Sequence, residues 1–365
     1  MSKLFSAQGA VCLAALAAFG AAPSAATAAE AVSFAGKRIE VMIPFAPGGG
    51  SDVYIRALQP FLEKHLPGKP TIIVRNVPGA GGIPGANQFQ TRAKPDGTDA
   101  IVVSASTVAN YVFQRSKVQY ELTKWEPVLL SPQGAVVYAS TSLGVNGPKD
   151  LPKLKGKPLV FGGQSATSAE LRAIVTFELL GLQPKFVWGL NRGPARLAFE
   201  RGELNINYDS APGYLKNASQ LVKAGKAVPL YSLGVLNEKG EVVRDPNFKD
   251  LPSFPEAYEM MHGKKPSGQG YEAWKALLKM GVMVNKALML PAGTPQPVLD
   301  AWRTAVRKVL DDPEFEKHAA AVVEGYPQFI GEPARPIIKD ATTFSPAAWD
   351  WIKTYLKTTH NTTLQ

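Results

Sequence analysis

A glycine-rich turn at residues 47–52, with the sequence Pro-Gly-Gly-Gly-Ser-Asp, lies between an apolar β-prone segment and a stretch with helical spacing. Glycines let backbone N–H groups approach a ligand closely, and the first turn of a helix favours negative charge. The turn lacks the lysine of a nucleotide-binding P-loop, which argues against a nucleotide phosphate. A carboxylate held by backbone N–H groups and a plain turn with a capped helix both remain open. Ser51 is the expected N-cap, and Asp52 suits the first helical turn.

A second glycine-rich turn, Pro-Gly-Ala-Gly-Gly at residues 78–82, also follows an apolar segment. Gly79 and Gly81 imitate the start of a dinucleotide-binding fingerprint. Pro84, however, stands where that fingerprint needs glycine or alanine. The turn therefore predicts a second backbone-rich loop ahead of a helix rather than a nicotinamide-cofactor site.

Two later segments carry polar side chains at expected helix starts. Residues 160–173 supply hydrogen-bonding groups that serve either a ligand or only helix capping: Gln164, Ser165, Thr167 and Ser168. Arg192 and Arg196 lie at the start of another expected helix, where cations oppose the helix dipole unless an anion is present. These arginines indicate an anionic ligand, with exposed surface arginines as the alternative.

Strand-like segments alternate with helical ones along the chain, which predicts an α/β fold with mostly parallel sheets. Several segments are apolar at successive positions, as is typical of strands covered on both faces. The eight expected strands are residues 39–45, 71–77, 100–106, 135–140, 158–163, 185–190, 204–210 and 228–235. Open α/β sheets bind ligands at the carboxyl ends of their strands. Two such domains facing each other would bring all four turns around one cleft.

The helical segments carry their own start and stop signals. Pro60 is expected to kink or shorten the helix that begins near residue 51. Thr167 and Glu170 have the spacing of a capping box. The stretch 236–280 is more polar and irregular than its surroundings, and we expect a surface excursion with a short helix there.

The first 29 residues have the features of a secretory signal peptide: Lys3, an apolar stretch, and small-residue cleavage sites after Ala28 or Ala29. A transmembrane anchor is the alternative, but the apolar stretch falls short of the ~20 residues that a span needs. The only cysteine, Cys12, lies in this segment. We therefore expect export to the periplasm and a mature chain with no disulfide, no metal and no other cofactor.

The mature chain, roughly 335 residues, is longer than one core usually spans, so two domains are expected. The formal net charge of the full chain is +10. Its basic residues form no run longer than pairs such as Lys264-Lys265. A solvated basic surface is therefore expected, and no nucleic-acid site.

Several segments together resemble the extracytoplasmic solute-binding receptors of tripartite tricarboxylate transporters, the Bug/TctC family. They are IPFAPGGGSD, VRNVPGAGGIPGA with AKPDGT, FGGQSATSAELRA, YDS and LPAGTP, within a match from about Ile39 to Trp351. The resemblance implies a type II-like periplasmic-binding-protein fold, whose two hinged domains close like a Venus flytrap on a carboxylate-bearing solute. The implied first domain is residues 30–130 with 236–365, and the second is 131–235.

The resemblance also implies which residues contact the solute. In the family, loops of the first domain bind a carboxylate through backbone groups and ordered waters, and the second domain contacts the rest of the solute. The matching first-domain positions are Phe45, Gly49, Gly50, Ser51, Asp52, Ala80, Gly81, Ser104, Ser106 and Thr107. The matching second-domain positions are Gln164, Ser165, Thr167, Ser168 and Asp209. We expect Asp52 to organise its loop, and Arg192 or Arg196 to pair with a second anionic or polar group of the ligand.

The chain departs from the family pattern at Arg75, where an acidic residue is usual, and around residues 191–193, where an aromatic is usual. These departures leave the solute open among dicarboxylates, tricarboxylates, aromatic acids and similar organic acids. The histidines form no H-E-x-x-H pair, and no G-x-S-x-G elbow occurs, which makes a periplasmic enzyme the weaker interpretation. A ligand sensor is a further alternative. The expected partners are a small carboxylate and the membrane subunits of a tripartite tricarboxylate transporter. The receptor itself is expected to be a monomer.

Overall fold

The structure, a computed structural model, describes residues 32–364 apart from residues 238, 319 and 324. The expected signal peptide, including Cys12, lies outside these residues. None of the helices in the described part of the chain is both long enough and apolar enough to cross a membrane.

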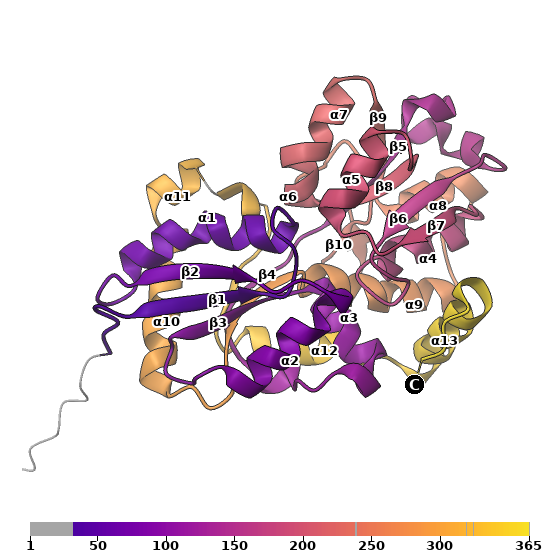
Figure 1. Ribbon diagram of the computed structural model, residues 1–365. Helices are drawn as coiled ribbons and strands as arrows, with labels where there is room; N and C mark the ends of the chain where they lie inside the picture. The colour runs from indigo at the N-terminus through magenta and orange to yellow at the C-terminus, as the bar shows by residue number, and fades with distance from the viewer. Residues whose placement is uncertain (1–31, 238, 319, 324, 365) are drawn as a thin grey trace, which may run out of the picture. The chain divides into compact units, whose positions relative to one another are not determined.

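A six-stranded sheet contains the first strands of the chain and some of the last, in the order β13-β4-β12-β3-β1-β2 (Figure 1). The strands are β1 (Arg38–Ile43), β2 (Thr71–Asn76), β3 (Asp99–Ser104), β4 (Glu126–Ser131), β12 (Lys286–Leu290) and β13 (Phe329–Ile330). β1 runs parallel to β2 and β3. β12 lies antiparallel between β3 and β4, and β13 is antiparallel to β4.

Helices cover both faces of this sheet. One apolar cluster joins it to α1 (Gly50–His65) and α10 (Gln296–Leu310). The other face packs on α2 (Ile83–Arg92), α3 (Ala105–Phe113) and α12 (Ala334–Ala341). A shorter helix, α11 (Pro313–His318), follows α10.

A five-stranded sheet is formed by the middle of the chain, in the order β7-β6-β8-β5-β9. Its strands are β5 (Ala135–Ser140), β6 (Val160–Gly163), β7 (Lys185–Trp188), β8 (Ile206–Ser210) and β9 (Ala227–Ser232). β6 is parallel to β7 and β8, whereas β5 is antiparallel to β8 and β9. A separate hairpin pairs β10 (Val235–Leu236) with β11 (Val242–Val243).

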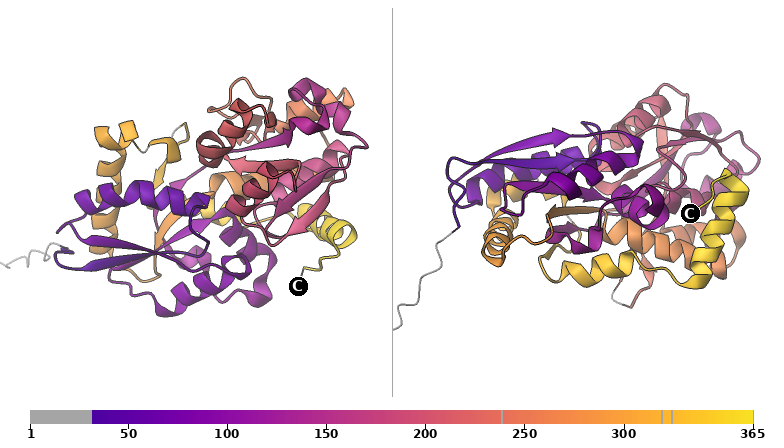
Figure 2. Two further views of the ribbon diagram at one scale, coloured as in Figure 1. Left: turned by 45° about the horizontal axis from the view of Figure 1, so that its top comes forward. Right: turned by 60° about the horizontal axis from the view of Figure 1, so that its bottom comes forward.

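The second sheet is also covered on both faces. On one face lie α5 (Arg192–Glu200), α6 (Ala211–Gly213) and α7 (Ser219–Lys223). On the other lie α4 (Leu171–Leu180), α8 (Phe254–His262) and α9 (Gln269–Leu278). The C-terminal helix α13 (Pro346–His360) packs on α9 (Figure 2).

The α/β class and the positions of all eight expected strands are confirmed. The expectation of mostly parallel sheets is wrong, because β12 and β5 bring antiparallel neighbours into the middle of the two sheets. A run of successive apolar residues indicates that a strand is buried on both faces. It carries no information about the direction of the strand.

Three local expectations also need correction. Helix α1 continues through Pro60 to His65, and its N-cap is Gly49 rather than Ser51. Helix α4 begins only at Leu171, since Glu170 turns towards another side chain instead of closing a capping box. The stretch 236–280 is not a surface excursion, because it contains α8 and α9 and contributes fully buried aromatic side chains to the core.

The chain passes from the first sheet to the second through residues 132–134. This connection is held by buried hydrogen bonds. Gln133 donates its backbone N–H to the carbonyl of Val282 at 3.0 Å and its side-chain amide to the carbonyl of Val322 at 2.7 Å. Asn285 Nδ2 donates to the Gln133 carbonyl at 3.2 Å. The connection is therefore tied to the residues just before β12.

Candidate functional site

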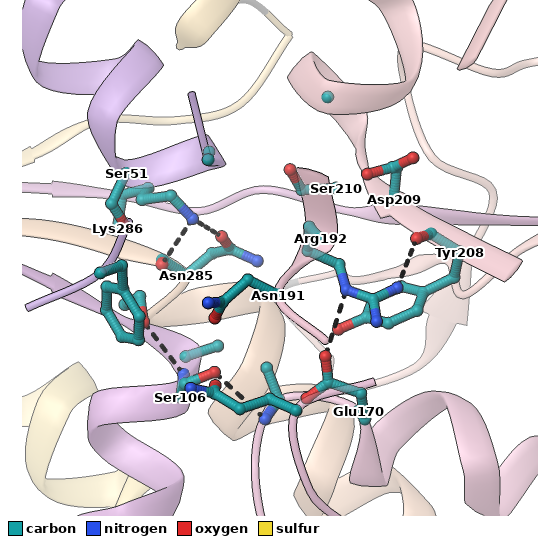
Figure 3. Close-up of a pocket in the computed structure, with 18 of the residues that line it drawn as sticks. Ser51, Ser106, Glu170, Asn191, Arg192, Tyr208, Asp209, Ser210, Asn285 and Lys286 are labelled. Atoms are coloured by element: carbon teal, nitrogen blue, oxygen red, sulfur yellow. Dashed lines mark hydrogen bonds and ion pairs between the residues drawn. The ribbon is translucent and has the colours of Figure 1, made fainter. Parts of the chain in front are cut away.

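A cavity of about 90 Å³ lies where strands from both sheets end. The first sheet contributes residues within 45–51 and 104–106, together with Asn285 and Lys286 at the start of β12. The second contributes residues within 164–172, 191–196 and 208–213. In Figure 3, Ser51 and Lys286 lie on one side of this space, with Arg192, Tyr208 and Asp209 on the other.

The start of α1 offers backbone donors to the cavity. Gly49, the N-cap, has no side-chain capping hydrogen bond, and the first N–H groups of a helix have no partner within it. Gly49, Gly50 and Ser51 all line the cavity. The start of α3 differs, because Ser104 Oγ accepts from the N–H groups of Ser106 and Thr107. The start of α1 is thus the better place for an anion.

Two arginines of α5 reach the cavity wall and are held by carboxylates of the chain. Arg196 donates Nε and Nη2 to the two oxygens of Asp209, at 3.0 and 2.8 Å. Arg192 Nε lies 3.1 Å from Glu170 Oε1, and its Nη2 donates to the Gly162 carbonyl at 2.6 Å. Burial works against the charge of both arginines, but these carboxylates outweigh it and raise the pKa of each guanidinium.

Two other cations line the cavity without a carboxylate within ion-pair distance in the described part of the chain. Arg172, on α4, donates Nη1 to the carbonyl of Gly281, and its Nε has no hydrogen-bond partner there. Lys286 Nζ donates to Asn285, at 3.1 Å to the carbonyl and 2.5 Å to Oδ1. Burial, with the nearby charge of Arg172, lowers the pKa of Lys286 to about 7.

The lining therefore carries an excess of positive charge. Four cations, Arg172, Arg192, Arg196 and Lys286, face two carboxylates, Glu170 and Asp209, which leaves a formal excess of two when all are ionised. Buried charges are costly unless they are paired. A small molecule with one or two negative groups is the chemical species that this arrangement can hold.

Comparisons with known proteins agree with this geometry. No family model matches the sequence. A UPF0065 protein of Bordetella pertussis is 27% identical over 299 residues, which are 80% of this chain and 82% of that protein. The periplasmic binding protein BugD superposes with a TM-score of 0.64 and 21% identity, over 88% of this chain and 97% of that chain. MatC from Rhodopseudomonas palustris, solved with bound malate, gives 0.63 and 22%, over 86% and 98%.

The chain is similar in sequence to a UPF0065 protein and in fold to solved proteins described as BugD and MatC, which agrees with the resemblance to the Bug/TctC family. Its fold is that of the periplasmic binding proteins, and the α/β expectation holds in this respect as well. BugD is a periplasmic binding protein, and at 21–22% identity these two structures show a shared fold.

Ten of the residues expected from the Bug/TctC motifs and from the charge pattern are brought together around the cavity. They are Phe45, Gly49, Gly50, Ser51, Ser104, Ser106, Gln164, Arg192, Arg196 and Asp209. Arg192 and Asp209 are engaged in the ion pairs described above, so their charged groups are not free for a ligand. Arg75, at a departure from the family pattern, pairs with Glu40 at 2.7 Å on β1 and β2, away from the cavity.

The other seven expected residues do not line the cavity. Ala80 and Gly81 form a 3-10 turn, in which the Gly81 carbonyl accepts from Asn110 Nδ2 at 2.7 Å. Thr107 completes the capping box of α3 with Ser104. These three residues shape the elements beside the cavity.

Ser165, Thr167 and Ser168 belong to a second network. Thr167 Oγ1 accepts from Gln114 Nε2 at 3.0 Å, which links the loop before α4 to the end of α3. Ser165 Oγ lies 3.3 Å from Thr167 Oγ1, and Ser168 Oγ donates to the Ser165 carbonyl at 2.8 Å. Their hydroxyl groups stabilise this loop.

Asp52 organises the glycine turn, as the sequence predicts. Its carboxylate accepts from the Gly48 N–H at 2.9 Å, from Arg56 Nε at 2.9 Å and from Asn76 Nδ2 at 3.1 Å. Asn76 also donates to the Phe45 carbonyl at 3.0 Å, so the end of β2 holds the same turn. Burial raises the pKa of Asp52, but the hydrogen bonds outweigh burial and lower it overall.

Replacing Asp52 by alanine should lower the free energy of unfolding by about 1–3 kcal/mol at pH 7, because three donors lose their hydrogen bonds to a buried, charged acceptor. The folded-state pKa lies below 3.8, so this stabilisation is present above pH 3.8 and is lost as the pH falls through the folded-state value. Urea unfolding at pH 7 and at lower pH measures both effects. Asp150→Ala, in a turn away from the cavity, is the control. An equal loss for both variants would contradict the prediction.

The residues that sequence reasoning missed are chiefly Arg172, Glu170, Asn285 and Lys286. Asn285 and Lys286 precede and begin β12, a strand that was not foreseen. A signal was present, since Arg172 and Lys286 are single cations embedded in apolar segments, LRAIVTF and VNKALML. A charged residue in such a position is rarely fully buried without a partner or a function.

Proposed function

We propose that this chain is a solute-binding protein of the periplasm that captures a small organic dicarboxylate for a tripartite tricarboxylate-type transporter. The observation that carries the proposal is the pair of buried cations, Arg172 and Lys286, which have no ion-paired carboxylate among the described residues and line a cavity shared by both sheets. Two such charges match the two charges of a dicarboxylate.

The size of the cavity supports a small solute. At roughly 10–15 Å³ for each water position, a volume of about 90 Å³ corresponds to about six to nine waters. A short-chain organic acid fits this space, whereas a nucleotide or a peptide does not. MatC, which shares the fold, was solved with bound malate, a dicarboxylate of this size class.

We propose that one carboxylate of the solute binds at the start of α1. Gly49, Gly50 and Ser51 bring backbone N–H groups to the cavity there, and Asp52 keeps the turn in place from behind. The hydroxyl group of Ser51 has no hydrogen-bond partner in the described part of the chain and is available to the solute. The second carboxylate would then face Arg172 from the other sheet.

Binding would favour closure of two domains. We assign residues 30–130 with 236–365 to one domain and 131–235 to the other, because these ranges separate the strands of the two sheets apart from Ser131 at the end of β4; α8, α9 and α13 of the first set extend over the second sheet. A ligand that touches both sides binds the closed form better than the open form and shifts the population towards it. The closed receptor would then deliver its solute, as a monomer, to the membrane subunits of the transporter.

A thermal-shift panel tests the function. Malate, succinate and adipate should raise the melting temperature of the mature protein, and a ligand at 100 times its Kd adds about 2.7 kcal/mol of stability. Butyrate, which has the length of succinate and one charge fewer, should stabilise less. An uncharged diol of the same length is the negative control. Failure of every carboxylate to stabilise the protein would contradict the proposal.

A further inference from the structure

We propose that Lys286 discriminates between dianionic and monoanionic ligands: its amine binds one carboxylate of a dianion and takes up a proton when the dianion binds. This inference rests on the proposed function, and it concerns how the same cavity distinguishes a dianion from a monoanion.

Lys286 lies beside the free backbone donors of α1. It is the first residue of β12, and only 6% of its surface is exposed. A Cβ atom placed on Gly50 would lie 3.6 Å from Lys286 Cε and 3.8 Å from Nζ. A carboxylate at the start of α1 would therefore touch the amine and the helix N–H groups together, as the position of Lys286 next to Ser51 in Figure 3 suggests.

The hydrogen bonds of the amine are incomplete for an ammonium group. Nζ has three donors when protonated, and the acceptors that it reaches, the carbonyl and Oδ1 of Asn285, are both neutral. Neutral acceptors compensate a buried positive charge only in part. An arriving carboxylate supplies the missing acceptor and the missing countercharge.

Among residues 32–364 that the structure describes, the charged groups around Lys286 provide no carboxylate that pairs with it. On α1, Asp52 is engaged by Gly48, Arg56 and Asn76. On α4, Arg172 adds a positive charge. The α5 arginines and their acidic partners are paired with each other, Arg192 with Glu170 and Arg196 with Asp209. The lining of α3 and of β12 itself adds no further charge.

Protonation of Lys286 then depends on the ligand. In the free protein its pKa is near 7, so above neutral pH most molecules carry the neutral amine. A carboxylate beside the amine favours the charged form and raises the pKa. Binding a dianion above pH 7 must therefore bring a proton with it, whereas below pH 7 the proton is already present.

The sign of the pH dependence follows. Affinity for a dicarboxylate should be constant just below pH 7, where both ligand carboxylates are ionised, and should fall by up to tenfold per pH unit above pH 7. A monocarboxylate can bind beside Arg172 while Lys286 stays neutral. Its affinity should therefore change little over the same range, and the preference for dianions should weaken at alkaline pH.

Isothermal titration calorimetry of the mature protein with succinate, malate, adipate and butyrate, in two buffers of different ionisation enthalpy at pH 8, tests this inference. We expect uptake of up to one proton with the dicarboxylates and none with butyrate. Lys286→Met should bind dicarboxylates at least tenfold more weakly, without proton uptake. Lys286→Arg, whose charge is permanent, should bind them without proton uptake and without the pH dependence.

Lys216→Met is the matched control, because Lys216 is exposed, is not one of the residues that line the cavity, and its replacement changes the net charge equally. It should behave as the wild type. If Lys286→Met fails to fold, the arginine variant alone carries the test. Equal affinity and proton uptake in wild type and variants would overturn the inference while leaving the proposed function intact. Absence of binding by every carboxylate to the wild type would overturn both.

Discussion

Replacing Asp209 by alanine should lower the free energy of unfolding by about 3–5 kcal/mol, because it leaves a buried arginine without its countercharge. Asp209 is 1% exposed, and both of its oxygens are engaged by Arg196. Tyr138, also buried, donates to the same carboxylate at 2.9 Å. Since a whole domain is stable by only about 5–15 kcal/mol, this one change should remove a large share of the total.

Urea unfolding with and without the change measures the effect. Glu203→Ala is the matched control, because Glu203 makes a similar two-point contact with Arg201 at the surface, where both side chains are more than half exposed. An exposed pair of this kind contributes little to stability. Asp209→Asn should fall between the two. If Asp209→Ala unfolds at the same urea concentration as Glu203→Ala, the buried pair does not have the role assigned to it.

Replacing Trp274 by alanine should cost about 3–5 kcal/mol of stability and should also weaken solute binding. Its side chain is fully buried on α9 and packs on Phe254, with ring centroids 4.4 Å apart. Its indole Nε1 donates to the carbonyl of Arg172 at 3.0 Å. Loss of the ring removes core packing, and loss of the hydrogen bond frees the turn of α4 that directs Arg172 into the cavity.

Two variants separate the effects. Trp274→Phe keeps an aromatic ring but removes the donor to the Arg172 carbonyl, so it should lose less stability than the alanine variant and still bind more weakly than the wild type. Trp351→Ala removes a partly exposed tryptophan of α13 and should leave binding unchanged. Chemical unfolding and titration with succinate provide the two measurements. Wild-type affinity in Trp274→Ala would show that α4 holds Arg172 without this support.

The cavity explains why the first glycine turn is built as it is. Three glycines bring backbone donors to the start of α1, and a buried carboxylate, Asp52, holds the turn from the side away from the ligand space. Gly82 of the second turn lies against Pro44 and Phe45, and Gly85 of α2 lies against Pro44, where a Cβ atom would approach within 2.8–3.1 Å. The second turn therefore supports the first rather than reaching the cavity.

The sequence by itself determined the features that depend on neighbours along the chain. Apolar runs located eight strands, because burial on both faces leaves a local pattern. Glycine turns after those strands predicted loops that open helices, and Asp52 was correctly assigned to its turn because its partners at positions 48 and 56 are four residues away. The motifs, whose spacing is also local, indicated the resemblance to the Bug/TctC family.

Only the tertiary structure decided the direction of the strands and the partners of the charged groups. Nothing local shows that Arg192 meets Glu170, or that Arg196 meets Asp209, although one of the two arginines was expected to pair with the ligand. Arg172 and Lys286 are 114 positions apart and come together only because β12 inserts beside β3 and α4 starts at the second sheet. Whether a charge is free depends on distance and burial, and the fold sets both.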